Sequence, residues 1–304
     1  MHEGSRKAIA AAFIANLGIA IAKFVGFFVT GAASMLAEAI HSVADTGNQG
    51  LLFLGGKRAT RTPTEEHPFG YGRERYFWSF VVSVMLFSMG GLFALYEGEE
   101  KLRRPHELES AWWAIGILSF AVVLEAFSLR TAYREASHVK QPDQTWWQFI
   151  RQAKIPELPV VLLEDVGALL GLTFALVGVT LAEITGNPRW DAVGSLAIGV
   201  LLVVLASVLA VEMKSFLIGE AASPAQRAAI RSALEGSPPV RRVIHMRTEH
   251  LGPDEILVGA KVEFDHGLSF PEVAGAIDAA EAAVRAAVPE ATVIYVEPDL
   301  ARGS

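Results

Sequence analysis

A row of polar and ionisable residues interrupts an apolar stretch near residue 40. Glu38, His41, Asp45, Asn48 and Gln49 stand at i, i+3, i+7, i+10 and i+11. This spacing places all five side chains on one face of a helix. His41 and Asp45 are one turn apart, so both can reach a single cation. The pattern predicts a metal-binding stripe, and the alternative is that His41 and Asp45 only bond to each other.

Two adjacent acids, Glu164 and Asp165, lie inside another apolar stretch. Neighbouring residues on a helix point about 100° apart, so these two carboxylates cannot face one ion equally well. Without a basic neighbour in their own stretch they repel each other and resist ionisation, which a bound cation would relieve. We therefore expect them to partner the first pair. The alternative is that Glu164 lies at a helix end near the aqueous surface.

The composition limits the chemistry that these residues can perform. The chain has no cysteine, so a metal site must use nitrogen and oxygen donors. Such donors disfavour Cu(I) and suit zinc, manganese, cobalt or iron. The net charge of −7 argues against nucleic acid as a partner. The sequence has no HExxH pair, nucleophile elbow or Walker-type loop, so we expect neither a hydrolase nor an ATP-driven pump.

Apolar stretches long enough to cross a bilayer, about 20 residues each, must position the polar groups. Six are present, at about 8–29, 32–55, 76–97, 111–130, 158–182 and 191–213. An ionisable group at mid-membrane costs roughly 2.5–3.5 kcal/mol, so those of the second and fifth spans must face a polar path or a bound ion. Six spans put both termini on one side, and the lysine and arginine residues between the spans place that side in the cytoplasm.

The region after residue 218 has a different, mixed composition. Ser223-Pro224 and Ser269 with Pro271 are helix starts, and Gly236 is a helix stop. Strand-like runs occupy Val240–Thr248, Ile256–Phe264 and Thr292–Val296. We expect an all-α six-helix membrane domain over residues 1–217. A small cytoplasmic α+β domain, ferredoxin-like with the order α-β-β-α-β, is expected over residues 218–304.

Other polar residues give weaker signals. Lys23 in the first span is expected to pair with a carboxylate or to extend to the membrane surface. Glu125 in the fourth span is open to a structural or a functional interpretation. A loop cluster of Glu65, Glu66 and His67 could hold a surface metal ion, the alternative being three solvated side chains.

Four stretches resemble the cation diffusion facilitator family. They are LAEAIHSVADTGNQ (36–49), HPFGYGRERYFW (67–78), DAVGSLAIGVLL (191–202) and FLIGEAA (216–222). The resemblance covers nearly the whole chain, domain order included. It implies a homodimer in the lipid bilayer, most simply the plasma (inner) membrane, that exports a divalent cation in exchange for protons by alternating access. No cofactor is implied, because the metal is the substrate: zinc first, with manganese, iron, cobalt and cadmium as alternatives.

The family's transport site uses paired ligands four residues apart in spans two and five. His41 and Asp45 match the first pair, and Asp165 matches the second member of the other. The first member, often histidine, falls at Val161, which cannot bind metal. Glu164, a water molecule or a group from another span is expected to replace it. A site with one imidazole and two or three carboxylates should favour zinc less sharply over manganese, iron or cobalt.

The resemblance also implies an ion pair of Arg73, with Glu220 as the first candidate, where the dimer halves or the two domains meet. In the C-terminal domain, Lys261 and Tyr295 stand where relatives place zinc-binding histidines. An ammonium repels a cation. We therefore expect no zinc cluster there and interpret the remaining histidines, His245, His250 and His266, as solvated.

The sequence leaves a second functional hypothesis open and argues against a third. The protein could be a membrane metal sensor or scaffold that binds without transporting, which a measurement of ion flux would distinguish. An intramembrane aspartyl protease needs two facing aspartates, usually with a glycine-rich motif at the second. Residues 164–167, Glu-Asp-Val-Gly, do not supply that motif.

Overall fold

The computed structural model describes residues 3–105, 111–140, 144–152 and 156–300, with side chains from residue 17 onward except that of residue 152. The chain forms two compact units. One comprises Met1–Gly55 and Phe77–Met213, and the other Gly56–Tyr76 and Lys214–Ser304. The segment Gly56–Tyr76 therefore groups with the C-terminal region, whereas the predicted domain 1–217 includes it.

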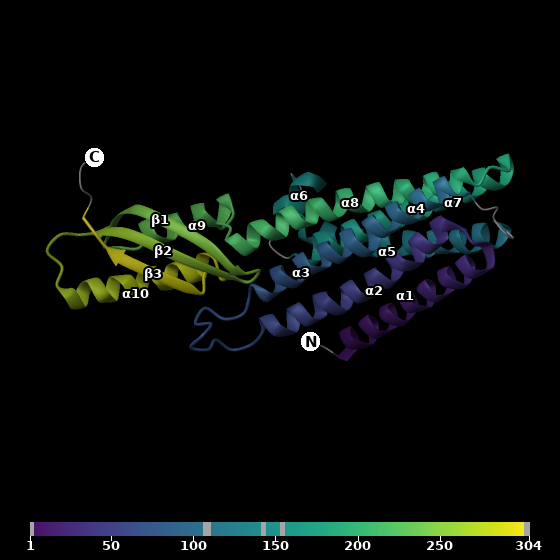
Figure 1. Ribbon diagram of the computed structural model, residues 1–304. Helices are drawn as coiled ribbons and strands as arrows, with labels where there is room; N and C mark the ends of the chain where they lie inside the picture. Colours follow the sequence, from purple (N-terminus) through teal and green to yellow (C-terminus); the bar gives the residue numbers. More distant parts are fainter. Residues whose placement is uncertain (1–2, 106–110, 141–143, 153–155, 301–304) are drawn as a thin grey trace. The chain divides into compact units, whose positions relative to one another are not determined.

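The first unit is built from six long helical segments in the described residues, lying alongside one another (Figure 1). They are α1 (Glu3–Thr30), α2 (Ala33–Ala59), α3 (Glu74–Met85) continued by the π-helix η1 (Leu86–Leu92) and α4 (Phe93–Arg103), α5 (Ala111–Val139), α7 (Glu157–Thr185) and α8 (Arg189–Ile218). A short helix, α6 (Trp146–Gln152), precedes α7. The segments match the six predicted spans, and η1 and α6 were not predicted.

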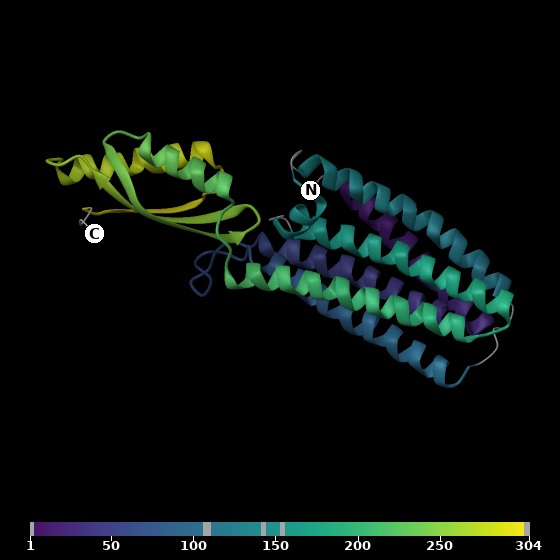
Figure 2. The same cartoon turned by 90° about the horizontal axis from the view of Figure 1, so that it is seen from above.

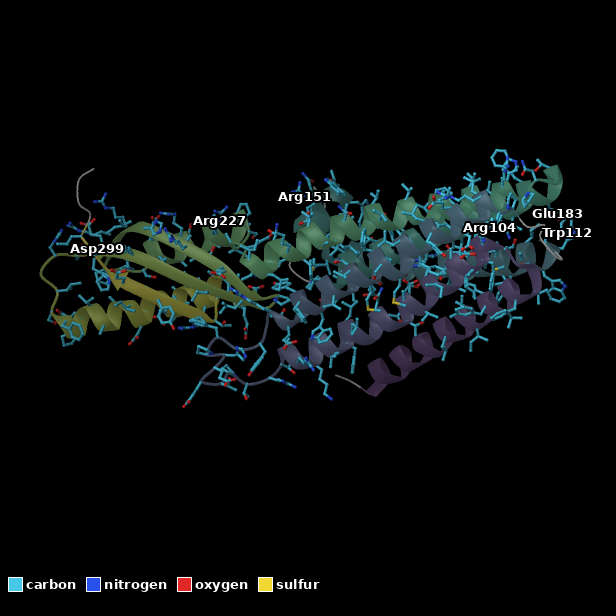
Figure 3. All side chains as sticks on the ribbon, viewed as in Figure 1. Arg104, Trp112, Arg151, Glu183, Arg227 and Asp299 are labelled. Atoms are coloured by element: carbon cyan, nitrogen blue, oxygen red, sulfur yellow. The ribbon has the colours of Figure 1, made fainter. Side chains whose placement is uncertain are left out.

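Four of these segments are long and apolar enough to cross a membrane. They are Glu74–Arg103, Ala111–Val139, Glu157–Thr185 and Arg189–Ile218. Helix α1 is described with its side chains only over the apolar part Leu17–Thr30. Helix α2 is less apolar because it carries the polar stripe. Arg104, Trp112 and Glu183 lie toward one end of the bundle and Arg151 toward the other (Figure 3), as the predicted topology requires.

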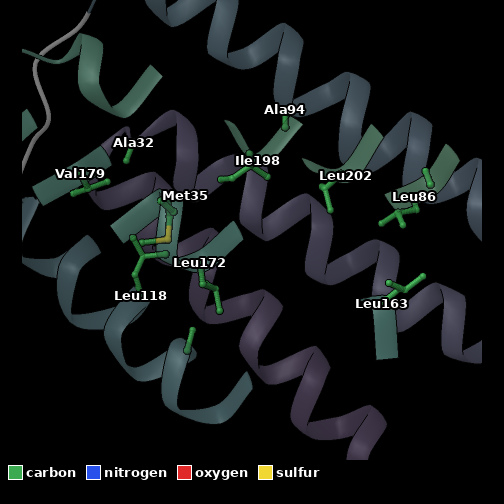
Figure 4. Close-up of a cluster of buried hydrophobic side chains, with 14 of the residues drawn as sticks. Ala32, Met35, Leu86, Ala94, Leu118, Leu163, Leu172, Val179, Ile198 and Leu202 are labelled. Atoms are coloured by element: carbon green, nitrogen blue, oxygen red, sulfur yellow. The ribbon is translucent and has the colours of Figure 1, made fainter. Parts of the chain in front are cut away.

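Small and branched apolar side chains fill the interior of the bundle (Figure 4), among them Met35, Leu118, Leu172 and Ile198. Helices α7 and α8 approach closely enough for their backbones to touch. A Cβ atom on Gly178 would lie 2.9 Å from the Trp190 carbonyl oxygen, and one on Gly194 would lie 2.9 Å from that of Phe174. Glycine at such positions lets membrane helices pack closely.

Asp191 in the first turn of α8 fixes the start of α2. Its carboxylate accepts hydrogen bonds from the backbone N–H groups of Ala33 (2.7 Å) and Ser34 (3.2 Å), and from the Ser34 hydroxyl. The first N–H groups of a helix have no partner within it, so this carboxylate caps α2. Lys101 donates to the carbonyl oxygen of Gly31, the left-handed residue between α1 and α2 (2.7 Å, φ 63°). These contacts hold the helix that carries the stripe.

The second unit contains a three-stranded sheet with two helices on one face (Figure 2). Its elements are α9 (Pro224–Glu235), β1 (Val240–Gly252), β2 (Glu255–Phe264), α10 (Phe270–Ala287) and β3 (Val293–Pro298). The strands lie in the order β1-β2-β3, with β1 antiparallel and β3 parallel to β2. The predicted α-β-β-α-β order is confirmed, and β1 extends four residues beyond its predicted end at Thr248.

Each helix of this unit begins at its predicted start, and the structure adds a capping box there that was not predicted. Ser223 pairs with Gln226 at the start of α9, and Ser269 pairs with Glu272 at the start of α10. The hydrogen bonds from the Ser269 side chain, and then from its backbone, hold the pKa of Glu272 below its usual value. Ile230, Val258 and Val262 are fully buried between the helices and the sheet.

Candidate metal-binding site in the helix bundle

Three of the four predicted ligands line one cavity inside the bundle. Asp45 of α2 and Glu164 and Asp165 of α7 share a space of about 30 Å³, room for an ion or one or two water molecules. The described residues that line it are Ile19, Ser42, Asp45, Gln49, Glu125, Ser128, Val161, Glu164 and Asp165. Residues more than a hundred positions apart in the chain therefore meet at this point.

The cavity is strongly acidic. Four carboxylates, those of Asp45, Glu125, Glu164 and Asp165, are among its described lining residues, and none of these residues is basic. Ser42, Gln49 and Ser128 add neutral oxygen donors. Carboxylates buried together in a membrane need a compensating cation or protons. The electrostatics therefore favour a small cation.

His41 is fully buried beside Asp45. Its Nε2 atom lies 3.6 Å from Asp45 Oδ2, beyond hydrogen-bond distance. Neither ring nitrogen, nor Asp45 Oδ1, has a hydrogen-bond partner within the described part of the chain. Leaving such groups unpaired costs about 1–3 kcal/mol each. The alternative in which the two side chains only bond to each other is not realised in this structure, and both retain free ligand atoms.

The two adjacent acids of α7 contact different neighbours, as their angular separation requires. Buried Glu164 accepts a hydrogen bond of 2.7 Å from Nδ2 of Asn48, so the stripe of α2 is tied directly to α7. Half-buried Asp165 accepts one of 3.1 Å from the Ser128 hydroxyl of α5. Glu164 is thus an interior residue, and the alternative that places it at an aqueous helix end is wrong.

Glu38, the first residue of the stripe, is held apart from the cavity. The Lys23 ammonium donates to Glu38 Oε2 (3.0 Å) and to Ser42 Oγ (2.7 Å), and all three residues are buried. Of the two alternatives for Lys23, the structure has the one that pairs it with a carboxylate. This ion pair neutralises Glu38 and leaves the rest of the stripe for other contacts.

The predicted ligands do not form a closed coordination shell in this conformation. Among the described residues, no three histidine or acidic side chains lie close enough together to hold one metal ion, the loop cluster with His67 included. His41 is not among the residues that line the cavity and is connected to it through Asp45. Val161, where the resemblance places a missing histidine, does line the cavity. To coordinate one ion together, the predicted ligand side chains would have to move closer to one another.

Arg73 forms an ion pair with Glu249, within the second unit. An acidic partner was predicted for Arg73, but the first candidate was Glu220.

On the sheet of this unit, Lys261 stands opposite His245. Its ammonium bonds to Glu297 (2.9 Å) and Asp299 (3.4 Å), and the Glu297 bond raises the pKa of Lys261 most. Lys261 therefore places a positive charge opposite His245. His250 is buried, so the interpretation of all three histidines as solvated is wrong for this residue.

Two features of the cavity were missed by sequence reasoning. Glu125 was left undecided, yet it lines the cavity together with Ser128. These residues stand three positions apart on α5, which was the available signal. The bond between Asn48 and Glu164 joins residues 116 positions apart, which no local pattern reveals.

Long apolar helices around a polar cavity, followed by a small α+β domain, are the architecture of a multi-pass membrane protein with an internal polar site. Residues 9–218 match the family model of the cation efflux transmembrane domain, and residues 222–299 match that of the cation efflux protein cytoplasmic domain. The chain therefore belongs to the cation diffusion facilitator family, which confirms the resemblance inferred from its motifs.

Curated relatives extend this comparison. The chain is 37% identical over 244 residues to the mitochondrial proton-coupled zinc antiporter SLC30A9 of Mus musculus. This match covers 80% of the chain but only 43% of the longer mouse protein. Metal tolerance protein C4 of Arabidopsis thaliana is 28% identical over 262 residues, covering 86% of the chain and 57% of that protein. A solved C-terminal domain variant of MamM is 26% identical, covering 26% of this chain and 93% of that one, with a TM-score of 0.24.

Proposed function

We propose that this protein exports a divalent metal cation across a membrane in exchange for protons. The observation that carries the proposal is the small cavity with four carboxylates, beside a buried histidine whose two ring nitrogens are unpaired. Zinc is the first candidate, supported by the names of the SLC30A9 relatives. Manganese, iron, cobalt and cadmium follow from the donor set.

His41, Asp45, Asp165 and Glu164 are the proposed ligands. A histidine must be neutral to donate its ring nitrogen, and carboxylates must be ionised to bind metal. Protons and metal therefore compete for the same atoms. A site open to an acidic exterior would take up protons and release its ion. Open to the more alkaline cytoplasm, it would lose the protons and reload.

The protein is proposed to work as a homodimer in the plasma (inner) membrane, with both termini in the cytoplasm. The match to the cytoplasmic domain of cation efflux proteins supports placing residues 218–304 on that side. The separation of Arg104, Trp112 and Glu183 from Arg151 along the bundle agrees with this topology.

Ion flux distinguishes this proposal from a sensor or scaffold that binds without transporting. The purified chain is reconstituted into sealed vesicles, and the uptake of zinc, manganese, iron, cobalt and cadmium is compared in competition under an imposed pH gradient. We expect uptake that is lost when the gradient is collapsed. Saturable binding without uptake would support the sensor instead.

A further inference from the structure

We propose that Glu125 of α5 is a ligand of the transported cation, in the place left open by Val161. This inference rests on the proposed function and adds a binding residue from a helix outside the two that carry the expected pairs. It also predicts how the metal preference of this chain is set.

The geometry of α5 carries the first step. Glu125 and Ser128 stand one turn apart, and both line the cavity that Asp45 and Asp165 share. The Ser128 hydroxyl is bonded to Asp165, which fixes this face of α5 against the cavity. Val161 stands one turn before Asp165 on α7 and lines the same cavity without a donor atom. Glu125 thus supplies a carboxylate to the space that Val161 faces.

The contacts of Glu125 argue against a purely structural role. Within the described residues, its carboxylate takes part in none of the hydrogen bonds or ion pairs that hold the bundle. The nearby Lys23 is already bound to Glu38 and Ser42. An ionisable side chain in a membrane helix is costly, and one that ties no helix to another points to the transported ion.

Unpaired groups around the cavity provide independent support for a ligand there. Both ring nitrogens of fully buried His41 lack a hydrogen-bond partner among the described residues, as does Oδ1 of buried Asn48, whose amide holds Glu164. Asp45 Oδ1 also lacks a hydrogen-bond partner among the described residues. Asp45 lines the cavity itself, whereas His41 and Asn48 adjoin it through Asp45 and Glu164. A cation in the cavity would give the unpaired oxygen of Asp45 a partner.

Exchanging an imidazole for a carboxylate makes the donor set harder. Manganese gains relative to zinc in such a site, because carboxylate oxygen suits manganese and imidazole suits zinc. The identity of residues 125 and 161 would therefore set the preference between the two metals. Introducing histidine at position 161 should shift the preference back toward zinc.

The test measures Mn²⁺ and Zn²⁺ binding to the purified full-length chain by calorimetry, for wild type, Glu125→Gln, Val161→His and the double variant. Glu125→Gln should weaken Mn²⁺ binding roughly ten- to hundredfold, as expected for loss of a charged ligand. Val161→His should raise the zinc-to-manganese affinity ratio, and the double variant should recover zinc but not manganese. Glu135→Gln, an exposed acid on the same helix, is the matched control and should bind as wild type.

Wild-type binding of both metals by Glu125→Gln, or an unchanged affinity ratio in Val161→His, would overturn the inference. Asp45→Ala separates this outcome from failure of the proposed function. If Asp45→Ala loses binding while Glu125→Gln does not, only the role of Glu125 is rejected. If neither variant loses binding, the transport site itself is misplaced.

Discussion

At the residue scale, His41 and Asp45 carry most of the chemistry that the sequence made visible. Their spacing of one helical turn follows from the chain alone. The burial of these two side chains and their unpaired ligand atoms cannot be read from the sequence, because both depend on neighbours from distant parts of the chain. Glu38 illustrates the difference, since it belongs to the same stripe but is neutralised by Lys23 of α1.

Replacing Asp45 or His41 by alanine should abolish transport without unfolding the protein. Both ring nitrogens of His41 and Oδ1 of Asp45 lack a hydrogen-bond partner among the described residues, so their removal breaks no such bond. Loss of a buried charge also relieves its desolvation cost. Thermal unfolding should therefore occur at or above the wild-type temperature, while vesicle flux disappears. Wild-type flux in a well-folded variant would contradict the assignment.

The two acids of α7 should differ in their roles. Asp165→Ala should weaken metal binding more than Glu164→Ala, because Asp165 stands at the family's ligand position. Glu164→Ala also leaves the buried amide of Asn48 without its acceptor, which should lower the free energy of unfolding by about 1–3 kcal/mol. Glu164→Gln keeps an acceptor oxygen and should restore stability. Equal binding by Asp165→Ala and wild type would show that the span-five alignment is wrong.

At the scale of elements, the lengths of the apolar stretches were sufficient to place the six spans, and helix-start, helix-stop and strand-like patterns were sufficient to predict the α-β-β-α-β order. The π-helix η1 could not be predicted, because Leu86–Leu92 is as apolar as the helices around it. Its two glycines let neighbouring helices approach η1 closely. A Cβ on Gly90 would lie 3.7 Å from His41 Nδ1, and one on Gly91 would lie 2.7 Å from Val203. These approaches between distant segments leave no trace in a local pattern.

Gly178→Ala should separate α7 from α8. Its new methyl group would meet the backbone at Trp190, which cannot move aside as a side chain does, so we expect a loss of about 1–3 kcal/mol in stability. Gly116→Ala on α5 is the control, because no atom lies within 4 Å of its new Cβ. The midpoint of thermal unfolding in detergent measures both. A shift shared by the two variants would rule out the packing explanation.

At the scale of the whole molecule, the absence of cysteine makes the topology directly testable. Glu65→Cys and Glu183→Cys place single thiols at exposed positions, one in the loop between α2 and α3 and one in the last turn of α7. A membrane-impermeant maleimide should label Glu183→Cys only from outside the cell and Glu65→Cys only in inside-out vesicles. In the proposed topology the second span ends at the cytoplasmic side and the fifth span ends at the outer side. Labelling of both from the same side would refute the six-span topology.

The reversal of metal flux by a reversed pH gradient tests proton exchange most directly. Wild-type vesicles are loaded with zinc-sensitive and pH-sensitive dyes, and the sign of the gradient is then inverted in matched samples. Because protons and metal compete for the carboxylates and imidazole of one cavity, zinc should move against the proton flow in both directions. Asp45→Ala vesicles should show neither movement. Zinc flux that keeps its direction and rate whatever the sign of the gradient would contradict the proposed exchange.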